Sequence, residues 1–161
     1  MNETHALLRK RIVPTVPESR PLQGDQWLDL PAIAEIEISS EDAERAIDFA
    51  LQPGRDGGWR ATQSGEQVLR VIFDRPQTLR RIRLVFIENH HPRTQEFHLR
   101  SSADGKNFRE VVRQQYNFNP PATETEDYSV ELNEVKILEL RIIPDISGGA
   151  STASLSELRL A

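Results

Sequence analysis

The sequence predicts an antiparallel β-sandwich, and two observations lead to this fold class. Several short segments carry an apolar residue at every second position, as in Leu138, Leu140 and Ile142. This period is typical of a strand with one face against the core and the other in solvent, and it differs from the period of a helix. About seven such segments occur in one chain of 161 residues, a length that suits a single domain with a core of its own.

The chain begins with an expected extended arm at residues 1–30, followed by the sandwich domain at residues 31–161. Pro14, Pro17 and Pro21 fix the backbone and remove hydrogen-bond donors, so the arm is predicted to run over the surface. Residues 27–30, Trp-Leu-Asp-Leu, are expected to hold the end of the arm against the domain.

The domain itself is predicted to contain strands separated by turns and one short helix. Helical spacing of Ala43, Ala46, Ile47 and Ala50, after a serine and two acids, predicts a helix near residues 42–51. Asp-Gly at 104–105 predicts a hairpin turn, and residues 119–121 and 147–149 predict loops. The alternating segments predict strands at 34–38, 69–73, 82–86, 97–99, 128–132, 138–142 and 158–160.

Composition limits the functions to be considered. The net charge of −5 gives no overall attraction to a phosphate backbone, so nucleic acid is not an expected partner. The chain has no cysteine and no apolar run long enough to span a bilayer. Its first residues lack the apolar stretch of a secretory signal, which predicts a cytoplasmic location if the sequence starts natively. The oligomeric state is not predicted.

The order of these segments resembles the discoidin-like, coagulation-factor type C domain of the galactose-binding-like superfamily, in its bacterial carbohydrate-binding-module type. The resemblance covers roughly residues 34–161 and includes Trp59-Arg60-Ala61 and the closing Leu155–Leu160 segment. Its most specific part is a strand followed by Ser102, Asp104, Gly105 and Phe108. The resemblance implies a jelly-roll sandwich of about eight strands, in agreement with the alternating pattern.

The resemblance also implies a non-catalytic binding module whose loops at one end meet carbohydrate, lipid head groups or protein. We expect carbohydrate recognition, and the alternative is an intracellular subunit that binds another protein. No nucleophile elbow, phosphate loop or metalloprotease motif occurs, so catalysis is not expected.

Two segments supply most of the candidate ligand-binding residues. Asn89, His91 and Arg93 lie in the connection of residues 88–96, where sugar binders of the family commonly place an arginine, and a guanidinium can reach two adjacent hydroxyls. The alternative is that Arg93 and Glu96 pair with neighbours and order the loop.

Tyr116 and Asn117 follow in residues 114–120, where an aromatic face and an amide could contact a sugar ring. Since Tyr116 and Phe118 are two residues apart, both could instead face the core. Trp59 is expected to be a core anchor, and its neighbour Arg60 is a further candidate for ligand binding.

Calcium is the expected metal, if any is bound. The resemblance implies an early-loop aspartate, backbone carbonyls and a late glutamate, and Asp48 and Glu157 match these positions. The alternative is that Glu157 pairs with an arginine, and the segment 49–58 is longer than the turn of the family. A zinc site at His90, His91 and His98 is a weaker hypothesis, since adjacent histidines seldom face one ion.

Overall fold

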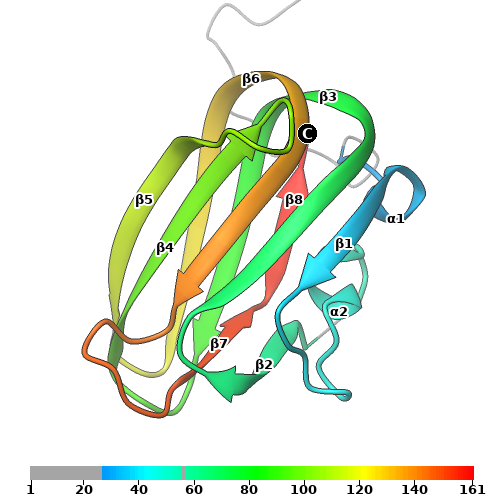
Figure 1. Cartoon of the computed structure of the whole chain (residues 1–161). Helices are drawn as coiled ribbons and strands as arrows, with labels where there is room; N and C mark the ends of the chain where they lie inside the picture. Colours follow the sequence, from blue (N-terminus) through cyan, green and yellow to red (C-terminus); the bar gives the residue numbers. More distant parts are fainter. Residues whose placement is uncertain (1–26, 56) are drawn as a thin grey trace, which may run out of the picture.

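The computed structural model describes residues 27–55 and 57–161, and these form the predicted antiparallel β-sandwich (Figure 1). Eight strands and two short helices occur within this part of the chain. In chain order they are α1 (Leu30–Ile33), β1 (Ala34–Ile38), α2 (Asp48–Leu51), β2 (Trp59–Ser64), β3 (Gln67–Glu88), β4 (Arg93–Ser102), β5 (Arg109–Phe118), β6 (Ala122–Ile143), β7 (Thr152–Leu155) and β8 (Glu157–Leu160).

Strands β3 and β6 link the two layers of the sandwich. Their outer portions pair with each other twice, with Gln67 opposite Ile142 in one layer and Glu88 opposite Ala122 in the other. The first layer has the order β1-β3-β6-β4-β5, while β8 pairs with the second half of β3. Strands β2 and β7 form a separate antiparallel pair.

The length of β3 and β6 differs from the sequence prediction. Segments 69–73 and 82–86 were expected as separate strands, and so were 128–132 and 138–142, but each pair belongs to one strand of 22 residues. Three register shifts between Ile72 and Arg81 let β3 curve over without ending the strand. The predicted number of about eight strands is still correct, because β2, β5 and β7 add to the alternating segments.

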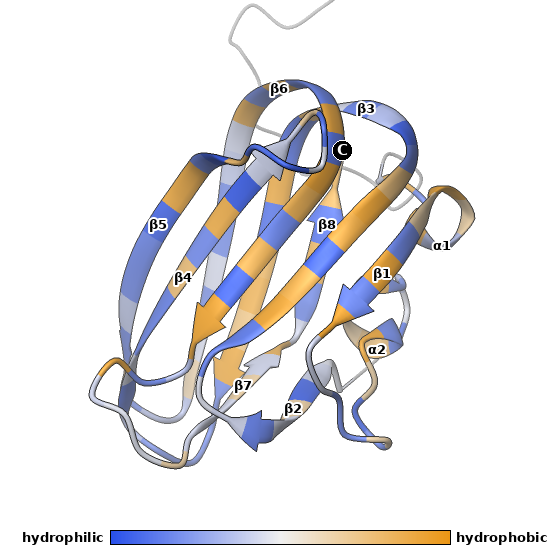
Figure 2. Ribbon diagram, in the orientation of Figure 1, coloured by the Kyte–Doolittle hydropathy of each residue, from blue (hydrophilic) through white to orange (hydrophobic). Residues whose placement is uncertain are grey.

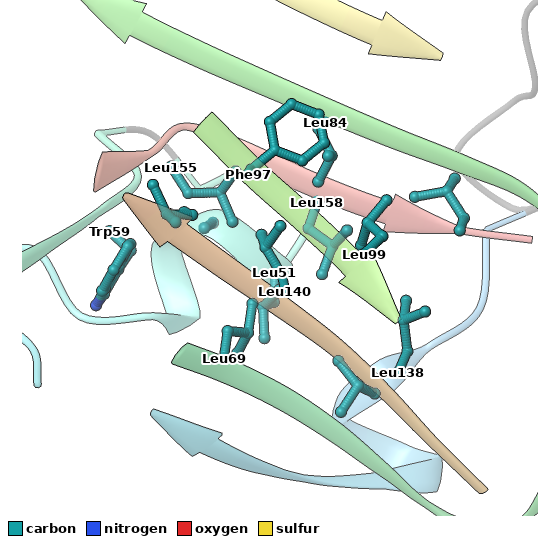
Figure 3. Packing of buried hydrophobic residues seen from close by; sticks show 14 of the residues in the cluster. Leu51, Trp59, Leu69, Leu84, Phe97, Leu99, Leu138, Leu140, Leu155 and Leu158 are labelled. Carbon is teal, nitrogen blue, oxygen red and sulfur yellow. The ribbon is translucent and has the colours of Figure 1, made fainter. Parts of the chain in front are cut away.

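The core lies between the layers, where the alternating apolar residues meet. In Figure 2 apolar and polar residues alternate along the strands, and Figure 3 shows leucines from several strands converging with Trp59 and Phe97. Phe86 and Phe97 pack with ring centroids 5.4 Å apart. The largest buried side chains are Trp59, Phe73, Phe86, Phe97, Phe118, Leu79, Ile82, Leu84, Leu99, Leu138, Leu140 and Ile142. Burial of this apolar area provides the main stabilisation of the domain.

The helix predicted near residues 42–51 is shorter in the structure, because α2 covers only Asp48–Leu51. The segment before it forms turns closed by acidic side chains. The carboxylate of Glu41 accepts the backbone N–H of Ile47 at 2.9 Å, which satisfies a donor without extending the helix.

The serines expected to start that helix bind elsewhere. The hydroxyls of Ser39 and Ser40 each donate to the side-chain oxygen of Gln67 at 2.7 Å, so they connect β1 to the start of β3. The end of the arm is held as predicted: Leu28 donates its N–H to the carbonyl of Leu160 at 2.8 Å, and Leu30 is buried. Residues 1–26 of the predicted arm lie outside the described residues.

Most arginines of the first layer are paired with carboxylates. Glu139 is fully buried on the outer face of this layer, where its carboxylate accepts bonds from Arg70, Arg100 and Arg141 at 2.6–3.0 Å. Burial alone would raise the pKa of Glu139, but the bond from Arg100 and those from the other two guanidinium groups lower it.

No helix in the described residues is long and apolar enough to cross a membrane.

Candidate functional site

Four loops meet at one end of the sandwich, which we call the loop end (bottom of Figure 1). They are residues 65–66, 89–92, 119–121 and 144–151, and they lie together because both ends of β3 and β6 reach this side. The two exposed large hydrophobic side chains of the described residues are Ile87 and Ile146, in or beside these loops. The loop end therefore exposes apolar surface that the rest of the described domain buries.

Two hollows open at the loop end, one on each side of the connection 89–92. The first, which we call the Arg93 hollow, is lined by Pro92, Arg93, Thr94, Asn117, Phe118, Asn119, Asp145 and Ser147. The second, the Arg60 hollow, is lined by Arg45, Gly57, Trp59, Arg60, Ile87, Asn89, His90, Ser154, Leu155 and Ser156. The two share no lining residue.

The guanidinium group of Arg93 is held by internal contacts on several sides. Its Nε donates to Glu88 at 2.7 Å, and its Nη1 donates to the carbonyl of Pro144 at 2.7 Å and to Gln95 at 3.2 Å. The group also lies 4.6 Å from the ring centre of Phe118, and only 2% of the side chain is exposed. Arg93 thus ties β3, β4, β5 and the 144–151 loop together.

Glu88 completes this arrangement. Its carboxylate accepts the bond from Arg93 and also the backbone N–H groups of His90 and His91, at 2.8 and 3.0 Å. Burial favours a higher pKa for Glu88, but these three donors outweigh it and hold the pKa at about 2. The 89–92 connection is therefore shaped by one ion pair at its base.

The other polar groups of the Arg93 hollow are also paired. The hydroxyl of Thr94 donates to the side-chain oxygen of Asn117 at 2.6 Å. Asp145 accepts the hydroxyl and the N–H of Ser147, which lowers the pKa of the Asp145 carboxyl. A ligand in this hollow would meet groups whose hydrogen bonds are largely made within the protein.

The Arg60 hollow is built on a close approach between β2 and β7. A Cβ atom at Gly58 would lie 2.5 Å from the carbonyl oxygen of Leu155, and the backbone of Gly58 has φ of +67°. Glycine lets the chain pass there and bury Trp59, whose indole N–H donates to the carbonyl of Ser40 at 2.9 Å. The expectation that Trp59 is a core anchor is confirmed.

Two arginines line the Arg60 hollow side by side. The N–H of Arg60 donates to the carbonyl of Arg45 at 3.1 Å, which fixes their backbones next to each other. Arg45 donates one side-chain bond to the carbonyl of Gly57 at 2.6 Å, and Arg60 donates one to the hydroxyl of Thr152 at 3.2 Å. Among the described residues, neither guanidinium pairs with a carboxylate.

The structure divides the residues that the sequence singled out. Arg93 and Asn117 line one hollow, and Arg60 and Asn89 line the other. His91 is exposed in the connection and lines neither. Tyr116 also lies outside both; its ring meets Phe118 edge-on at 5.0 Å and it packs partly against the core.

Several lining residues have no signal in the sequence. The pairing of β2 with β7 places Ser154, the backbone bond from Arg60 places Arg45, and the folding of the 144–151 loop places Asp145. A sequence motif could not identify them, because their neighbours in space are distant in the chain.

Of the two residues expected to hold calcium, Glu157 lies against Arg159. The guanidinium of Arg159 donates to the carbonyls of Ala50 and Gln52, at 2.8 and 3.3 Å, and lies 3.3 Å from the Glu157 carboxylate. Calcium requires six to eight oxygen ligands, and here two carbonyls and a carboxylate already surround a buried cationic side chain. Asp48 is exposed, so this set does not fit a calcium ion.

No group of three or more metal-ligating side chains occurs in the part of the chain that the structure describes. The three histidines of the zinc hypothesis are divided. His98 lies on β4 and bonds to Glu96 at 2.6 Å, while the rings of His90 and His91 are 6.3 Å apart in the 89–92 connection. Whether the protein binds a metal stays a prediction to be measured.

Solved structures with similar folds include binding modules and an enzyme. The family 32 carbohydrate-binding module of AlyQ, in complex with 4,5-unsaturated mannuronic acid, is 17% identical with a TM-score of 0.60, covering 80% of this chain and 95% of that one. The family 32 module of C. perfringens NanJ, in complex with galactose, is 13% identical with a TM-score of 0.59, covering 79% and 92%. An allantoicase is 15% identical with a TM-score of 0.56, covering 80% of this chain and 39% of the enzyme.

At these identities the similarity shows a shared fold, and the ligands of those modules are not thereby assigned to this chain. No curated protein matches the chain by sequence. The F5/8 type C domain, however, matches residues 35–158, which is nearly the whole sandwich and includes the Ser102–Phe108 turn that carried the resemblance. Together with the eight-stranded sandwich and its loop end, this match shows that the chain belongs to the F5/8 type C domain family.

Proposed function

We propose that this protein is a non-catalytic module that binds carbohydrate through its loop end. The observation that carries the proposal is the concentration of ligand-type surface there: two hollows, both exposed large hydrophobic side chains of the described residues, and several hydrogen-bonding groups. The similar solved modules with bound sugars support the same class of ligand.

The chemistry of the loop end suits a sugar. A pyranose presents hydroxyls that need directional donors and acceptors, and C–H faces that pack on apolar groups. In the Arg60 hollow, Ile87 offers the apolar contact while Asn89 and the hydroxyls of Ser154 and Ser156 offer polar contacts. We expect weak binding, because a shallow site makes few bonds and must displace well-hydrated partners.

A glycan array with the full chain tests this proposal. We expect a restricted set of positive glycans, and the signal should fall when a bulky residue closes the loop end, as in Ser154→Trp. A matched change at the opposite end, Lys106→Trp at an exposed position of the turn after β4, should leave the signal unchanged.

A pull-down from the source cell separates this function from the alternative of a protein-interaction subunit. An array without signal, together with one stoichiometric protein partner, would contradict carbohydrate binding. A partner whose capture is lost in Ser154→Trp would then assign the loop end to protein recognition.

A further inference from the structure

No carboxylate partner among the described residues pairs with the guanidinium groups of Arg45 and Arg60, and in this they differ from five arginines of the strands. Arg70, Arg100 and Arg141 share Glu139, Arg93 is paired with Glu88, and Arg159 with Glu157. Since Arg70 also pairs with Glu37 and Arg141 with Glu66, each of these guanidinium charges has a carboxylate to balance it. The Arg60 hollow thus holds two positive charges in a protein whose net charge is −5.

No carboxylate lies in the described lining of this hollow. Asp42, whose backbone pairs with that of Arg45, uses one carboxylate oxygen to accept the N–H of Glu44 at 2.9 Å. Glu88, the last residue of β3 and the neighbour of Ile87 in the lining, pairs with Arg93 instead. Within the described part of the chain, no carboxylate balances the two arginines, so an anionic group that enters the hollow can pair with them.

The arginines are also positioned for binding. Each makes one bond through Nη1 to a neighbouring oxygen, which orients the planar group and leaves its other N–H donors without a partner in the described structure. The side chains of Asn89 and His90, on the facing connection, make no hydrogen bond to the described residues. A ligand can thus gain bonds here without breaking internal ones.

We propose that the Arg60 hollow binds an acidic sugar, with Arg45 and Arg60 holding its carboxylate. A guanidinium matches a carboxylate through parallel N–H bonds, and a charged pair is stronger than a bond to a neutral hydroxyl. Asn89, His90 and the two serines then face the hydroxyls of the ring, and Ile87 faces its C–H surface. This inference rests on the proposed carbohydrate binding and specifies the ligand class and the hollow.

Calorimetric titration with two forms of one ligand tests the inference. The probes are a galacturonate trisaccharide and the same trisaccharide with its carboxylates methyl-esterified. We expect the acid form to bind about tenfold more tightly, and added salt to reduce this preference. Arg45→Gln and Arg60→Gln should each weaken binding of the acid form about fivefold and leave the ester almost unaffected.

Arg75→Gln is the matched control, since it removes the same charge from an exposed position near the middle of β3, where the register shifts, far along the strand from the loop end. It should not change the affinity for the acid form or for the ester.

Backbone amide NMR of the unmodified chain gives a second readout that needs no variant: the acid form should shift the signals of Arg60, Asn89 and Ser154. Inorganic phosphate at the same concentration should shift them less, because it offers nothing to the other lining groups.

The outcomes separate this inference from the proposed function. Equal affinity for the two forms, or a preference that survives Arg45→Gln/Arg60→Gln, would overturn the acidic-sugar assignment. If neutral glycans on the array are positive at the same time, the proposed carbohydrate binding is supported and only the acidic-sugar assignment is wrong. If neither the trisaccharides nor the array give a signal, both are wrong.

Discussion

The arginines of the two hollows at the loop end differ in how many internal partners they have. In the Arg93 hollow the guanidinium is buried and bonded to Glu88, Gln95 and the Pro144 carbonyl. In the Arg60 hollow the two guanidinium groups each make a single hydrogen bond to the described residues, and none of these residues pairs with them through a carboxylate. An arginine in a loop is therefore not by itself a sign of ligand binding; the number of its internal partners distinguishes a structural role from a binding role.

The strongest test of this difference is to remove each arginine and compare stability. Arg93→Met should lower the free energy of unfolding by about 3 kcal/mol, because it leaves the Glu88 carboxylate largely buried without its counter-ion. Arg60→Gln should change it by less than about 0.5 kcal/mol, since its charge is paired with no carboxylate of the described residues. Urea unfolding of both variants measures the contrast.

The double variant Arg93→Met/Glu88→Gln sharpens this test. It removes both charges together, so it should recover part of the loss seen in Arg93→Met alone. Equal destabilisation by Arg93→Met and Arg60→Gln would contradict the assignment of different tasks.

The next largest effect concerns the wall of the Arg60 hollow. Gly58→Ala should cost about 1–3 kcal/mol, because its Cβ would meet the Leu155 carbonyl at 2.5 Å and its φ is positive. For a domain of this size the melting temperature should fall by several degrees, at about 2–4 °C per kcal/mol. Gly54→Ala is the matched control, since its φ of +81° carries the same backbone strain without a nearby atom. A drop no larger than that of the control would argue against a close β2–β7 contact.

Much of the fold could be predicted because it depends on local alternation. Leu138, Leu140 and Ile142 face the core as their spacing indicates. The continuity of β3 and β6 could not be predicted, since Pro76 in β3 and the polar residues near the middle of both strands are typical of a turn between two strands. That continuity comes from register shifts, which depend on pairing between distant strands.

The candidate site was less predictable for a related reason. The sequence indicated Arg93 as a ligand-binding residue of the 88–96 connection and Arg60 as a further candidate beside Trp59, but only the folded chain brings Glu88 and the Pro144 carbonyl to Arg93. The shortened helix has the same origin, since the Glu41 side chain takes the Ile47 N–H that a longer helix would have used. A linear pattern does not show which side chain will bond to which in the folded protein.

Acid provides a third test of the Arg93 hollow, because the pKa of Glu88 is held at about 2. A carboxyl whose pKa is lower in the folded than in the unfolded state stabilises the fold above its unfolded pKa of about 4.5, and this contribution is lost as the pH falls toward 2. Wild type should therefore exceed Glu88→Gln in stability by about 1–2 kcal/mol at pH 7, and the difference should shrink below pH 4.5. A difference that is constant from pH 7 to pH 2 would contradict this account.

The smallest expected effect is that of calcium, and it extends the comparison to Arg159. Like Arg93, Arg159 is buried and surrounded by internal oxygens, here those of Ala50, Gln52 and Glu157. A metal that binds only the folded state would raise the melting temperature. We expect neither calcium nor a chelator to shift it, because the guanidinium already supplies the positive charge between α2 and β8. A calcium-dependent rise that Glu157→Gln abolishes would instead show that Asp48 and Glu157 hold a metal as the family resemblance implied, and that Arg159 moves aside to admit it.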